Sequence, residues 1–565
     1  MRQPGVDALE RSRWLPLLCL ALASACLMLP IWLSGFPTNG DDAHVHIRWQ
    51  TVFAQQLWDG ELYPRWLGAM NSGLGSPAFF IYPPLPHFVA ALLAPLSDGP
   101  SWVQQRLGIG ATLGLFIGGV GAYLWLKRLT GTRLSALAGA MVFLLAPYHL
   151  FLDTYYRAAY AELWAFSWAP FSLLAIHLFA SAPARAALLY ALATAALFFS
   201  HAPSCIALPP LYLAYAALLA IRSKRPDIFW WTIAASACAV LLAGVYLATA
   251  LAHQSNIDAQ ALYTGYFDFF RWFLLSRQEW PEEDFELAIG GVSLPQYAAL
   301  LVLGGLVLLA RQSDALTRTL IIASIAGSLL ILFLMSPLSG PVWSLLPLAR
   351  KIQFPWRLLA AQTVLLALVC ALYARWAQAA KAQGSRALQH RLLLPLFIGL
   401  VLANVGAITH GGPHFGSTGP LGTLDVPEYQ MGPVPASSAL FTGDADTALL
   451  SGQGSIRLER VSSRRLAVHI DAVTDVRFAL RQFDYPGWTC LDARSGMACK
   501  MAPYSEQLPV LTVTTGPGSS RLDLVLDQTD SERNGRLISL AGLLVLAGLT
   551  GFGLKRQRRM KTALH

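Results

Sequence analysis

The sequence has 565 residues, of which 55% are hydrophobic and only 13% are charged. Soluble domains carry about 25% charged residues, so this composition excludes an ordinary soluble globular protein. The net charge of +9 does not indicate a nucleic-acid-binding protein, because Lys and Arg gather in the cytoplasmic loops of membrane proteins. The composition is typical of a polytopic α-helical membrane protein.

Apolar stretches of about 17–25 residues, the length that crosses a bilayer as a helix, recur along the chain. They predict about twelve spans, near residues 14–34, 103–126, 134–151, 160–180, 186–200, 204–221, 228–250, 293–310, 317–336, 356–376, 391–409 and 537–554. One further apolar stretch, 79–96, is not counted as a span, because a crossing there would place Lys127, Arg128 and Arg133 on the external side. Pro83, Pro84 and Pro86 near its start also suit a half-buried helix that does not cross. With this choice, the loops rich in Lys and Arg and both termini all lie on the cytoplasmic side.

The predicted topology divides the chain into three parts. Residues 1–409 form a multi-span membrane domain whose first external loop is 35–102. Residues 410–536 alternate polar and apolar side chains, as in Leu522-Asp523-Leu524-Val525-Leu526, which predicts a small external β-rich domain. Residues 537–565 form a final transmembrane helix and a basic cytoplasmic tail. If the β-rich domain is external, a disulfide between Cys490 and Cys499 is plausible.

The first external loop begins with a dense polar cluster that includes Asp41, Asp42, His44, His46 and Arg48. A carboxylate at the membrane surface can act as a general base or hold a divalent metal ion. His can bind metal or relay protons, and Arg can hold a phosphate. The alternative is a solvated loop, since Gly-Asp-Asp also favours an ordinary turn.

The rest of this loop combines Arg65 and Tyr82 with other aromatic residues, Gly and Pro. Such a surface suits a sugar or a lipid headgroup, and the alternative is an aromatic belt at the membrane interface. Glu162 lies at the start of an apolar span, a costly and usually functional position, although it could instead form a structural pair with Arg157. His201 lies at the external end of the fifth predicted span and is a weaker candidate.

A second group of candidates lies in the external segment that contains Lys351, Gln353 and Arg357. Basic residues on the external side oppose the usual charge bias of membrane proteins, and binding a lipid phosphate explains them. The alternative is that they reach out to lipid headgroups. The sequence contains no Walker loop, dinucleotide-binding fingerprint, zinc-protease motif or nucleophile elbow.

Four short motifs, in this order, carry a resemblance to a known superfamily: Gly40-Asp41-Asp42 with His46 and Arg48, Tyr63-Pro64-Arg65-Trp66, Gln353-Phe354-Pro355-Trp356-Arg357, and Tyr485-Pro486-Gly487-Trp488. The chain resembles the GT-C superfamily of membrane glycosyltransferases. Within it, the chain looks like the bacterial membrane proteins named "6-pyruvoyl-tetrahydropterin synthase-related" and the YfhO-like group.

The resemblance implies a sugar transferase that uses a polyprenyl-phosphate sugar on the external face of a bacterial inner membrane. It implies that Asp41 or Asp42 is the base, and that Arg157, Arg357, Lys351 or a divalent metal stabilises the leaving phosphate. The expected partners are the lipid-linked sugar and membrane lipid, and no nucleic-acid partner is expected. Two alternatives remain: a transporter or flippase of lipid-linked intermediates, and a non-catalytic envelope assembly protein.

Overall fold

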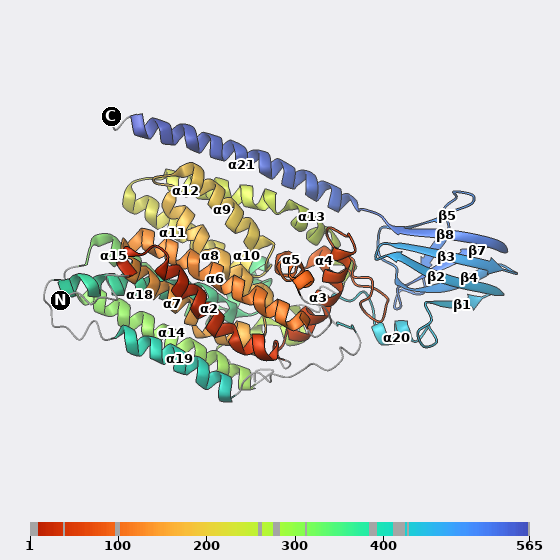
Figure 1. Cartoon of the computed structure of the whole chain (residues 1–565), viewed down its shortest axis with the longest axis horizontal. Coiled ribbons are helices and arrows are strands. Elements are labelled where there is room, and N and C mark those ends of the chain that lie inside the picture. Colours follow the sequence, from red (N-terminus) through yellow and green to blue (C-terminus); the bar gives the residue numbers. More distant parts are fainter. Residues whose placement is uncertain are drawn as a thin grey trace.

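The computed structural model describes residues 9–37, 40–96, 102–257, 263–274, 283–310, 313–382, 392–410, 424–426 and 429–562. A long body of helices carries a β-sandwich at one end (Figure 1). The chain is thus a multi-pass helical membrane protein with a small β domain, as the sequence predicts.

The helices of the first half are α2 (Leu15–Ser34), α3 (Ala43–Trp58), α4 (Ala78–Ile81), α5 (Leu85–Leu92), α6 (Val103–Thr130), α7 (Arg133–Leu145), the π-helical η3 (Tyr148–Tyr156), α8 (Tyr160–Leu178), α9 (Pro183–Phe198), α10 (Ser204–Ala207), α11 (Pro209–Ser223), α12 (Asp227–Leu242) and α13 (Gly244–His253). Those of the second half are α14 (Glu283–Leu309), α15 (Ala315–Leu334), α16 (Gly340–Leu345), α17 (Pro347–Arg350), α18 (Leu359–Ala382), α19 (Leu393–His410), α20 (Val434–Ser438) and α21 (Asp530–Thr562). Short 3₁₀ segments are η1 (Ala94–Leu96), η4 (Gln254–Asn256), η6 (Gly265–Phe267), η7 (Phe269–Trp272), η8 (Pro337–Ser339) and η9 (Pro355–Leu358).

Among the described residues, eight helical stretches are long and apolar enough to cross a membrane, or nine if the pair α12 and α13, bent by 66°, is one span. Every predicted span is helical, but three of the predicted twelve fall outside these nine. The apolar parts of α9 and α19 are shorter than a full span, and α8 carries Glu162 and His177. The central helix is α18, which packs against α7, α14 and α15.

Close packing of α6 against α8 places the start of α8 within the body. A side chain added at Gly114 would lie 2.7 Å from Leu163, and one added at Gly118 would lie 3.1 Å from the backbone of Ser167. Small residues spaced four apart allow two helices to approach closely inside a membrane. The hydroxyl of Ser167 donates to the carbonyl of Gly114 at 2.7 Å and joins the two helices.

The apolar stretch 79–96 is not one continuous helix. It is divided into α4, α5 and η1, and the break between α4 and α5 contains Pro83 and Pro84. Proline removes a backbone donor and interrupts a helix. The longest apolar piece, Leu85–Leu96, is too short to cross a bilayer.

The β domain consists of two four-stranded antiparallel sheets with strand orders β1-β4-β7-β6 and β2-β3-β8-β5. The strands are β1 (Thr447–Ser451), β2 (Gly454–Ser462), β3 (Arg465–Ala472), β4 (Val476–Phe483), β5 (Trp488–Asp492), β6 (Lys500–Pro503), β7 (Val510–Thr515) and β8 (Gly518–Leu526). Apolar side chains of both sheets form one buried cluster. A disulfide joins Cys490 of β5 to Cys499.

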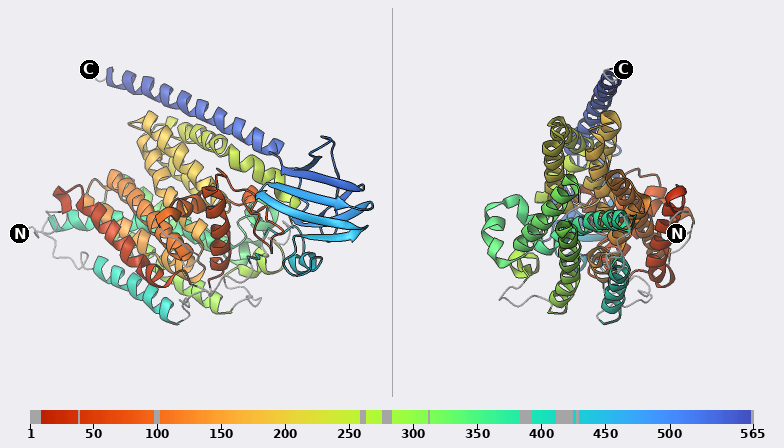
Figure 2. Two further views of the ribbon diagram at one scale, coloured as in Figure 1. Left: turned by 45° about the vertical axis from the view of Figure 1, so that its right-hand side comes forward. Right: turned by 90° about the vertical axis from the view of Figure 1, so that its left-hand side faces the viewer.

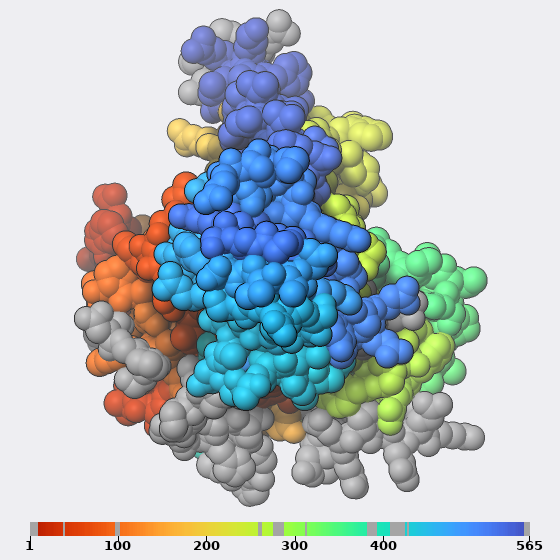
Figure 3. All heavy atoms as spheres, turned by 90° about the vertical axis from the view of Figure 1, so that its right-hand side faces the viewer, coloured from red at the N-terminus to blue at the C-terminus, as the bar shows by residue number. Residues whose placement is uncertain are grey.

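The sandwich covers the centre of one end of the body, with helices around its rim (Figure 3). Residues of the first loop lie between the two parts: Trp66 and Phe80 are buried in the cluster of the sandwich. The amide of Phe483 also donates to the carbonyl of Leu74 at 2.8 Å. From the sandwich, α21 runs along the outside of α13, α12 and α9 (Figure 2).

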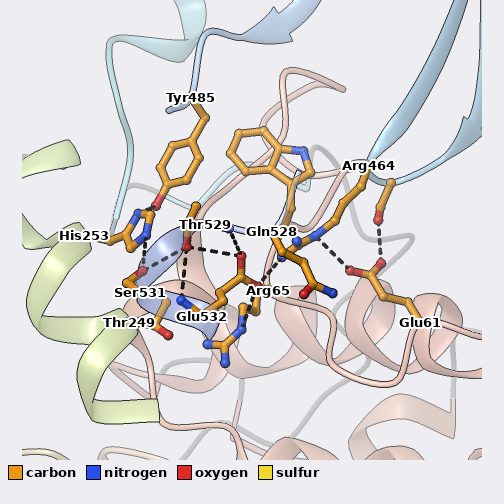
Figure 4. A network of polar contacts seen from close by, with 12 residues as sticks. Glu61, Arg65, Thr249, His253, Arg464, Tyr485, Gln528, Thr529, Ser531 and Glu532 are labelled. Atoms are coloured by element: carbon orange, nitrogen blue, oxygen red, sulfur yellow. Dashed lines mark hydrogen bonds and ion pairs between the residues drawn. The ribbon is translucent and has the colours of Figure 1, made fainter. Parts of the chain in front are cut away.

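Four charged residues join the first loop, the sandwich and α21, and we call them the junction network: Glu61, Arg65, Arg464 and Glu532 (Figure 4). Arg65 and Glu532 are both almost fully buried and lie 3.2 Å apart. Arg464 lies 3.2 Å from Glu532 and 3.5 Å from Glu61. The network also reaches α13, because Arg65 Nη2 donates to the carbonyl of Val245 at 2.7 Å.

Glu532 also closes the start of α21. Its carboxylate accepts from the amide of Thr529 at 2.9 Å, and the hydroxyl of Thr529 accepts from the amide of Glu532 at 3.3 Å. This reciprocal pair is a capping box, which satisfies two backbone donors at a helix start. It begins α21 before the apolar residues of the span, which is why the helix starts earlier than the predicted residue 537.

Candidate functional site

The polar cluster of the first loop folds directly onto the segment between η3 and α8. The backbone amide of Asp42 donates to the carbonyl of Arg157 at 2.9 Å. Glycine at position 40 favours this approach, because a side chain there would lie only 3.0 Å from Cβ of Ala158. Ala158 itself has a left-handed backbone (φ +54°), a strained conformation for a residue other than glycine. The fold therefore holds the first loop and Arg157 together at some conformational cost.

Arg157 lies among four carboxylates. Its guanidinium is 3.0 Å from Glu162, 3.1 Å from Asp153, 3.5 Å from Asp42 and 3.9 Å from Asp41. Glu162 and Asp153 are completely buried, whereas the side chains of Asp41 and Asp42 are 37% and 39% exposed. Although burial lowers the pKa of Arg157, the surrounding carboxylates, Asp42 first, raise it well above its usual value. Arg157 is therefore a permanent cation.

Glu162 connects Arg157 to a second arginine. Its carboxylate lies 3.3 Å from Nε of Arg357 and accepts from the hydroxyl of Tyr148 at 2.8 Å. The ring of Trp356 lies beneath the guanidinium of Arg157, 4.7 Å from its centre. The two arginines thus share one buried carboxylate.

Gln353 orients the second arginine. Its side-chain oxygen accepts from Nη1 of Arg357 at 2.6 Å, and the same nitrogen donates to the carbonyl of Ile352 at 2.9 Å. Gln353 has a left-handed backbone (φ +68°), so strain is again localised beside a charged group. Among the described residues, the structure gives Nη2 of Arg357 no hydrogen-bond partner, which leaves that nitrogen for a ligand.

A cavity of about 430 Å³ brings these groups together. Its charged and polar walls include Asp41, Asp42, Arg157 and Arg357. The remaining lining is mostly aromatic or apolar: Val45, His46, Trp49, Ile81, Tyr82, Pro83, His201, Ala202, Pro203, Tyr246, Ala250, Gln254, Ile257, Tyr263, Tyr266, Phe267, Trp272, Gln353, Phe354, Trp356 and Tyr429. A mostly apolar cavity of this size with a few converging charges is typical of a small-molecule site.

Two histidines in the wall are neutral at pH 7. Burial is the main cause in both cases, and it lowers the pKa of His46 to about 4 and that of His201 to about 3. Nδ1 of His201 is fixed by the hydroxyl of Ser204 at 2.8 Å. Neither ring adds positive charge to the cavity at neutral pH.

Acidification from pH 7 to pH 5 is expected to destabilise the protein through these histidines. Both pKa values in the folded state lie below the unfolded value of about 6.5, so the stability that these histidines contribute is fully present above pH 6.5 and is lost as the pH falls. At pH 5 the stability lost through each histidine is roughly 1–2 kcal/mol. Thermal unfolding in detergent should show a smaller loss for His201→Gln than for the wild type. His469→Gln, at a half-buried position on the sandwich away from the cavity, should lose as much stability as the wild type; an equal loss in all three proteins contradicts the assignment.

Metal binding has limited support from the side chains. The described residues contain no group of three or more His, Cys, Asp and Glu side chains arranged to hold a metal ion. Asp41 and Asp42 are the carboxylates on the cavity wall that could contribute ligands to a divalent cation, and a substrate phosphate would have to complete such a site.

The structure brings together nine of the residues singled out from the sequence: Asp41, Asp42, His46, Tyr82, Arg157, Glu162, His201, Gln353 and Arg357. It does not bring His44, Arg48, Arg65 or Lys351 to the cavity lining. His44 and Arg48 are four residues apart on α3 and share a face that differs from that of His46. Arg65 belongs to the junction network, and Lys351 is exposed.

Sequence reasoning missed several residues of the site. Tyr148 and Trp356 orient Glu162 and Arg157, and Trp49 and Tyr429 line the cavity. Trp356 belongs to a motif noted in the sequence, and Trp49 lies one turn from His46 on α3, so both could have been found. Tyr148 and Tyr429 have no signal in their local sequence.

No family model matches the sequence, and no curated protein matches it. Solved structures of several membrane proteins are similar, three of them as follows. Arabinofuranosyltransferase AftD from Mycobacteria has a TM-score of 0.42 and 21% identity over 70% of this chain and 27% of its own. Oligosaccharyltransferase from Archaeoglobus fulgidus has a TM-score of 0.42 and 12% identity over 71% and 57%. ArnT from Cupriavidus metallidurans, bound to undecaprenyl phosphate, has a TM-score of 0.32 and 12% identity over 88% and 97%. The chain thus spans about a quarter of the length of the arabinofuranosyltransferase.

Proposed function

We propose that this protein transfers a sugar from a polyprenyl-phosphate donor to an acceptor hydroxyl at the external face of a bacterial inner membrane. The observation that carries the proposal is that one cavity combines two accessible carboxylates, Asp41 and Asp42, with two buried arginines, Arg157 and Arg357. Such a transfer requires a base that takes a proton from the acceptor hydroxyl and a cation that binds the phosphate of the donor. The sequence resemblance to GT-C glycosyltransferases supports the same reaction.

The two arginines have different capacities for an anion. Arg157 is surrounded by four carboxylates, which repel a further negative charge. Arg357 contacts one carboxylate, that of Glu162, and retains Nη2 for a ligand. Arg357 is therefore the phosphate ligand in our proposal, and Arg157 orients Asp41 and Asp42.

The reaction then proceeds as an inverting displacement. The carboxylate of Asp41 or Asp42 takes the proton of the acceptor hydroxyl as its oxygen bonds to the anomeric carbon. The bond from that carbon to the phosphate oxygen breaks, and its electron pair leaves with the polyprenyl phosphate. The guanidinium of Arg357 stabilises the additional charge on the leaving phosphate. A sugar bound against the aromatic wall would displace water from it, which limits hydrolysis of the donor.

Binding of undecaprenyl phosphate to the purified protein in nanodiscs tests the phosphate site. Arg357→Met is expected to weaken binding about 10–100-fold, the effect of one charge-assisted hydrogen bond. Arg350→Met, at an exposed position in the same segment, is the matched control and should bind as the wild type does. Arg357→Lys keeps the positive charge beside Glu162 and guards against a loss of fold. Unchanged affinity in Arg357→Met contradicts the proposed phosphate site.

A further inference from the structure

His46 connects the cavity to a second buried histidine. It lies on the inner face of α3, in contact with the rings of Trp49, Tyr82 and Tyr160, and its own ring is almost completely buried. Its Nδ1 lies 3.3 Å from Nε2 of His87, on α5. With Nδ1 engaged in this way, Nε2 is the ring nitrogen left for the cavity, and the structure gives it no partner among the described residues.

Gln50, one turn after His46 on α3, determines which nitrogen of His87 carries the proton. One of the two orientations of its side-chain amide satisfies all the neighbouring groups. In that orientation the oxygen accepts from the amide of Ala91 at 3.0 Å, and the NH₂ group donates to Nδ1 of His87 at 3.0 Å and lies 3.3 Å from the carbonyl oxygen of the same residue. In the opposite orientation the NH₂ group of Gln50 would face the amide of Ala91, which is also a donor. The side-chain oxygen of Gln50 would face the carbonyl oxygen of His87, which is also an acceptor. Nδ1 of His87 is therefore an acceptor.

The proton positions of both rings follow from this one orientation. A neutral imidazole carries one N–H, and a His87 that accepts at Nδ1 must carry its hydrogen on Nε2. That hydrogen is donated to Nδ1 of His46, so His46 in turn carries its own hydrogen on Nε2. If both nitrogens of His87 carried a proton, the Nδ1–H would face the NH₂ donor of Gln50. The hydrogen bond from Gln50 therefore also excludes the charged form of His87.

We propose that Gln50, His87 and His46 form a hydrogen-bond chain of fixed polarity, which presents the Nε2–H of His46 to the cavity as a donor to a substrate oxygen. In this arrangement His46 cannot take a proton from the acceptor through Nε2, and that function is left to Asp41 or Asp42. Gln50 and His87 are positioning residues. The assignment of this oxygen to the sugar or the phosphate of a lipid-linked sugar rests on the proposed function. The polarity of the hydrogen-bond chain does not depend on the proposed function.

Nitrogen NMR of the protein labelled with [¹⁵N]histidine in nanodiscs measures the polarity without any substrate. Protonated and unprotonated ring nitrogens have well-separated shifts, and the His46 signals are assigned by their loss in His46→Gln. The wild type at pH 7 is expected to carry the proton on Nε2 of His46 and none on Nδ1. A proton on Nδ1, or on both nitrogens, overturns the proposal.

Two variants test the positioning residues. His87→Phe keeps an aromatic ring between Phe53 and Phe79 but removes the donor to His46, so His46 should populate both neutral forms. Gln50→Leu keeps the approximate shape and removes the donor to His87, and it should shift His46 in the same direction by a smaller amount. His44→Gln, on the other face of α3, should leave the His46 signals unchanged. A His46 ring that stays in a single form in His87→Phe contradicts the chain.

Ligand binding then identifies the oxygen. If the Nε2–H of His46 donates to a phosphate oxygen, His46→Phe is expected to lose about 10–100-fold in affinity for undecaprenyl phosphate. If it donates to a sugar oxygen, the variant should lose about 10–100-fold in sugar transfer alone. His46→Gln retains a side-chain donor and should recover part of that loss. If His46→Phe changes neither quantity while the wild type binds and transfers, His46 does not act on the substrate. If the wild type itself neither binds nor transfers, the proposed function fails and the NMR result still stands.

Discussion

Replacing both Asp41 and Asp42 with Asn is expected to reduce sugar transfer by a factor of about 10²–10⁴, the usual contribution of a general base. Asn keeps the size of the side chain and removes the basic oxygen. Both carboxylates lie at the cavity and within 4 Å of Arg157, Asp42 at 3.5 Å and Asp41 at 3.9 Å. The rate is measured as polyprenyl phosphate released from the lipid-linked sugar.

The single variants identify the base, because the one that loses as much activity as the double variant carries it. Asp59→Asn is the matched control: Asp59 is an exposed acid at the end of α3, in the same loop. It should transfer sugar at the wild-type rate. A double variant with normal abundance and unchanged transfer contradicts the assignment of the base to this loop.

Replacing Glu532 with Ala is expected to lower the free energy of unfolding by about 3–5 kcal/mol, because it leaves Arg65 buried without its anion. The same change removes the capping box of α21 and the contact with Arg464. Thermal unfolding in detergent should therefore begin at a clearly lower temperature. Since the junction network also reaches α13, which lines the cavity through Tyr246 and Ala250, binding of undecaprenyl phosphate should weaken as well.

Two controls separate the buried pair from general effects at the start of α21. Asp530→Ala removes an exposed partner of Arg533, two residues before Glu532 on the same helix, and should change stability by less than about 1 kcal/mol. In the double variant Arg65→Met with Glu532→Leu, no charge of the pair is left unpaired, so it should be more stable than Glu532→Ala. A double variant that is as unstable as Glu532→Ala would show that the ion pair is not the cause.

The membrane class and the β domain were predictable because each rests on a periodic local signal. Apolar runs of span length predict helices, and alternation predicts strands, whatever lies beside them. The distribution of Lys and Arg over the loops, supported by Pro83, Pro84 and Pro86, predicted that the stretch 79–96 does not cross. The difference in the number of spans arises where helices such as α9 are short or, like α8, carry polar residues for the site.

The site was predictable only as a collection of candidates. Treating residues 41–48 as a loop hid the helix α3, whose inner face carries His46, Gln50 and Phe53 at helical spacing. Glu162 and Arg157 were considered either as a functional residue or as a structural pair, and the structure places them 3.0 Å apart beside the cavity. The burial of Arg65 against Glu532 joins the first loop to the last helix, and no local pattern announces such a contact.

The most direct test of the central claim supplies purified protein to membranes from cells that lack it, with mass spectrometry of the lipids and glycans. We predict that the wild-type protein consumes a polyprenyl-phosphate sugar and releases polyprenyl phosphate in equal amount, while one glycan gains one sugar. Arg357→Met should do this far more slowly. If no lipid-linked sugar is consumed and no glycan gains a sugar, the cavity does not carry out this transfer.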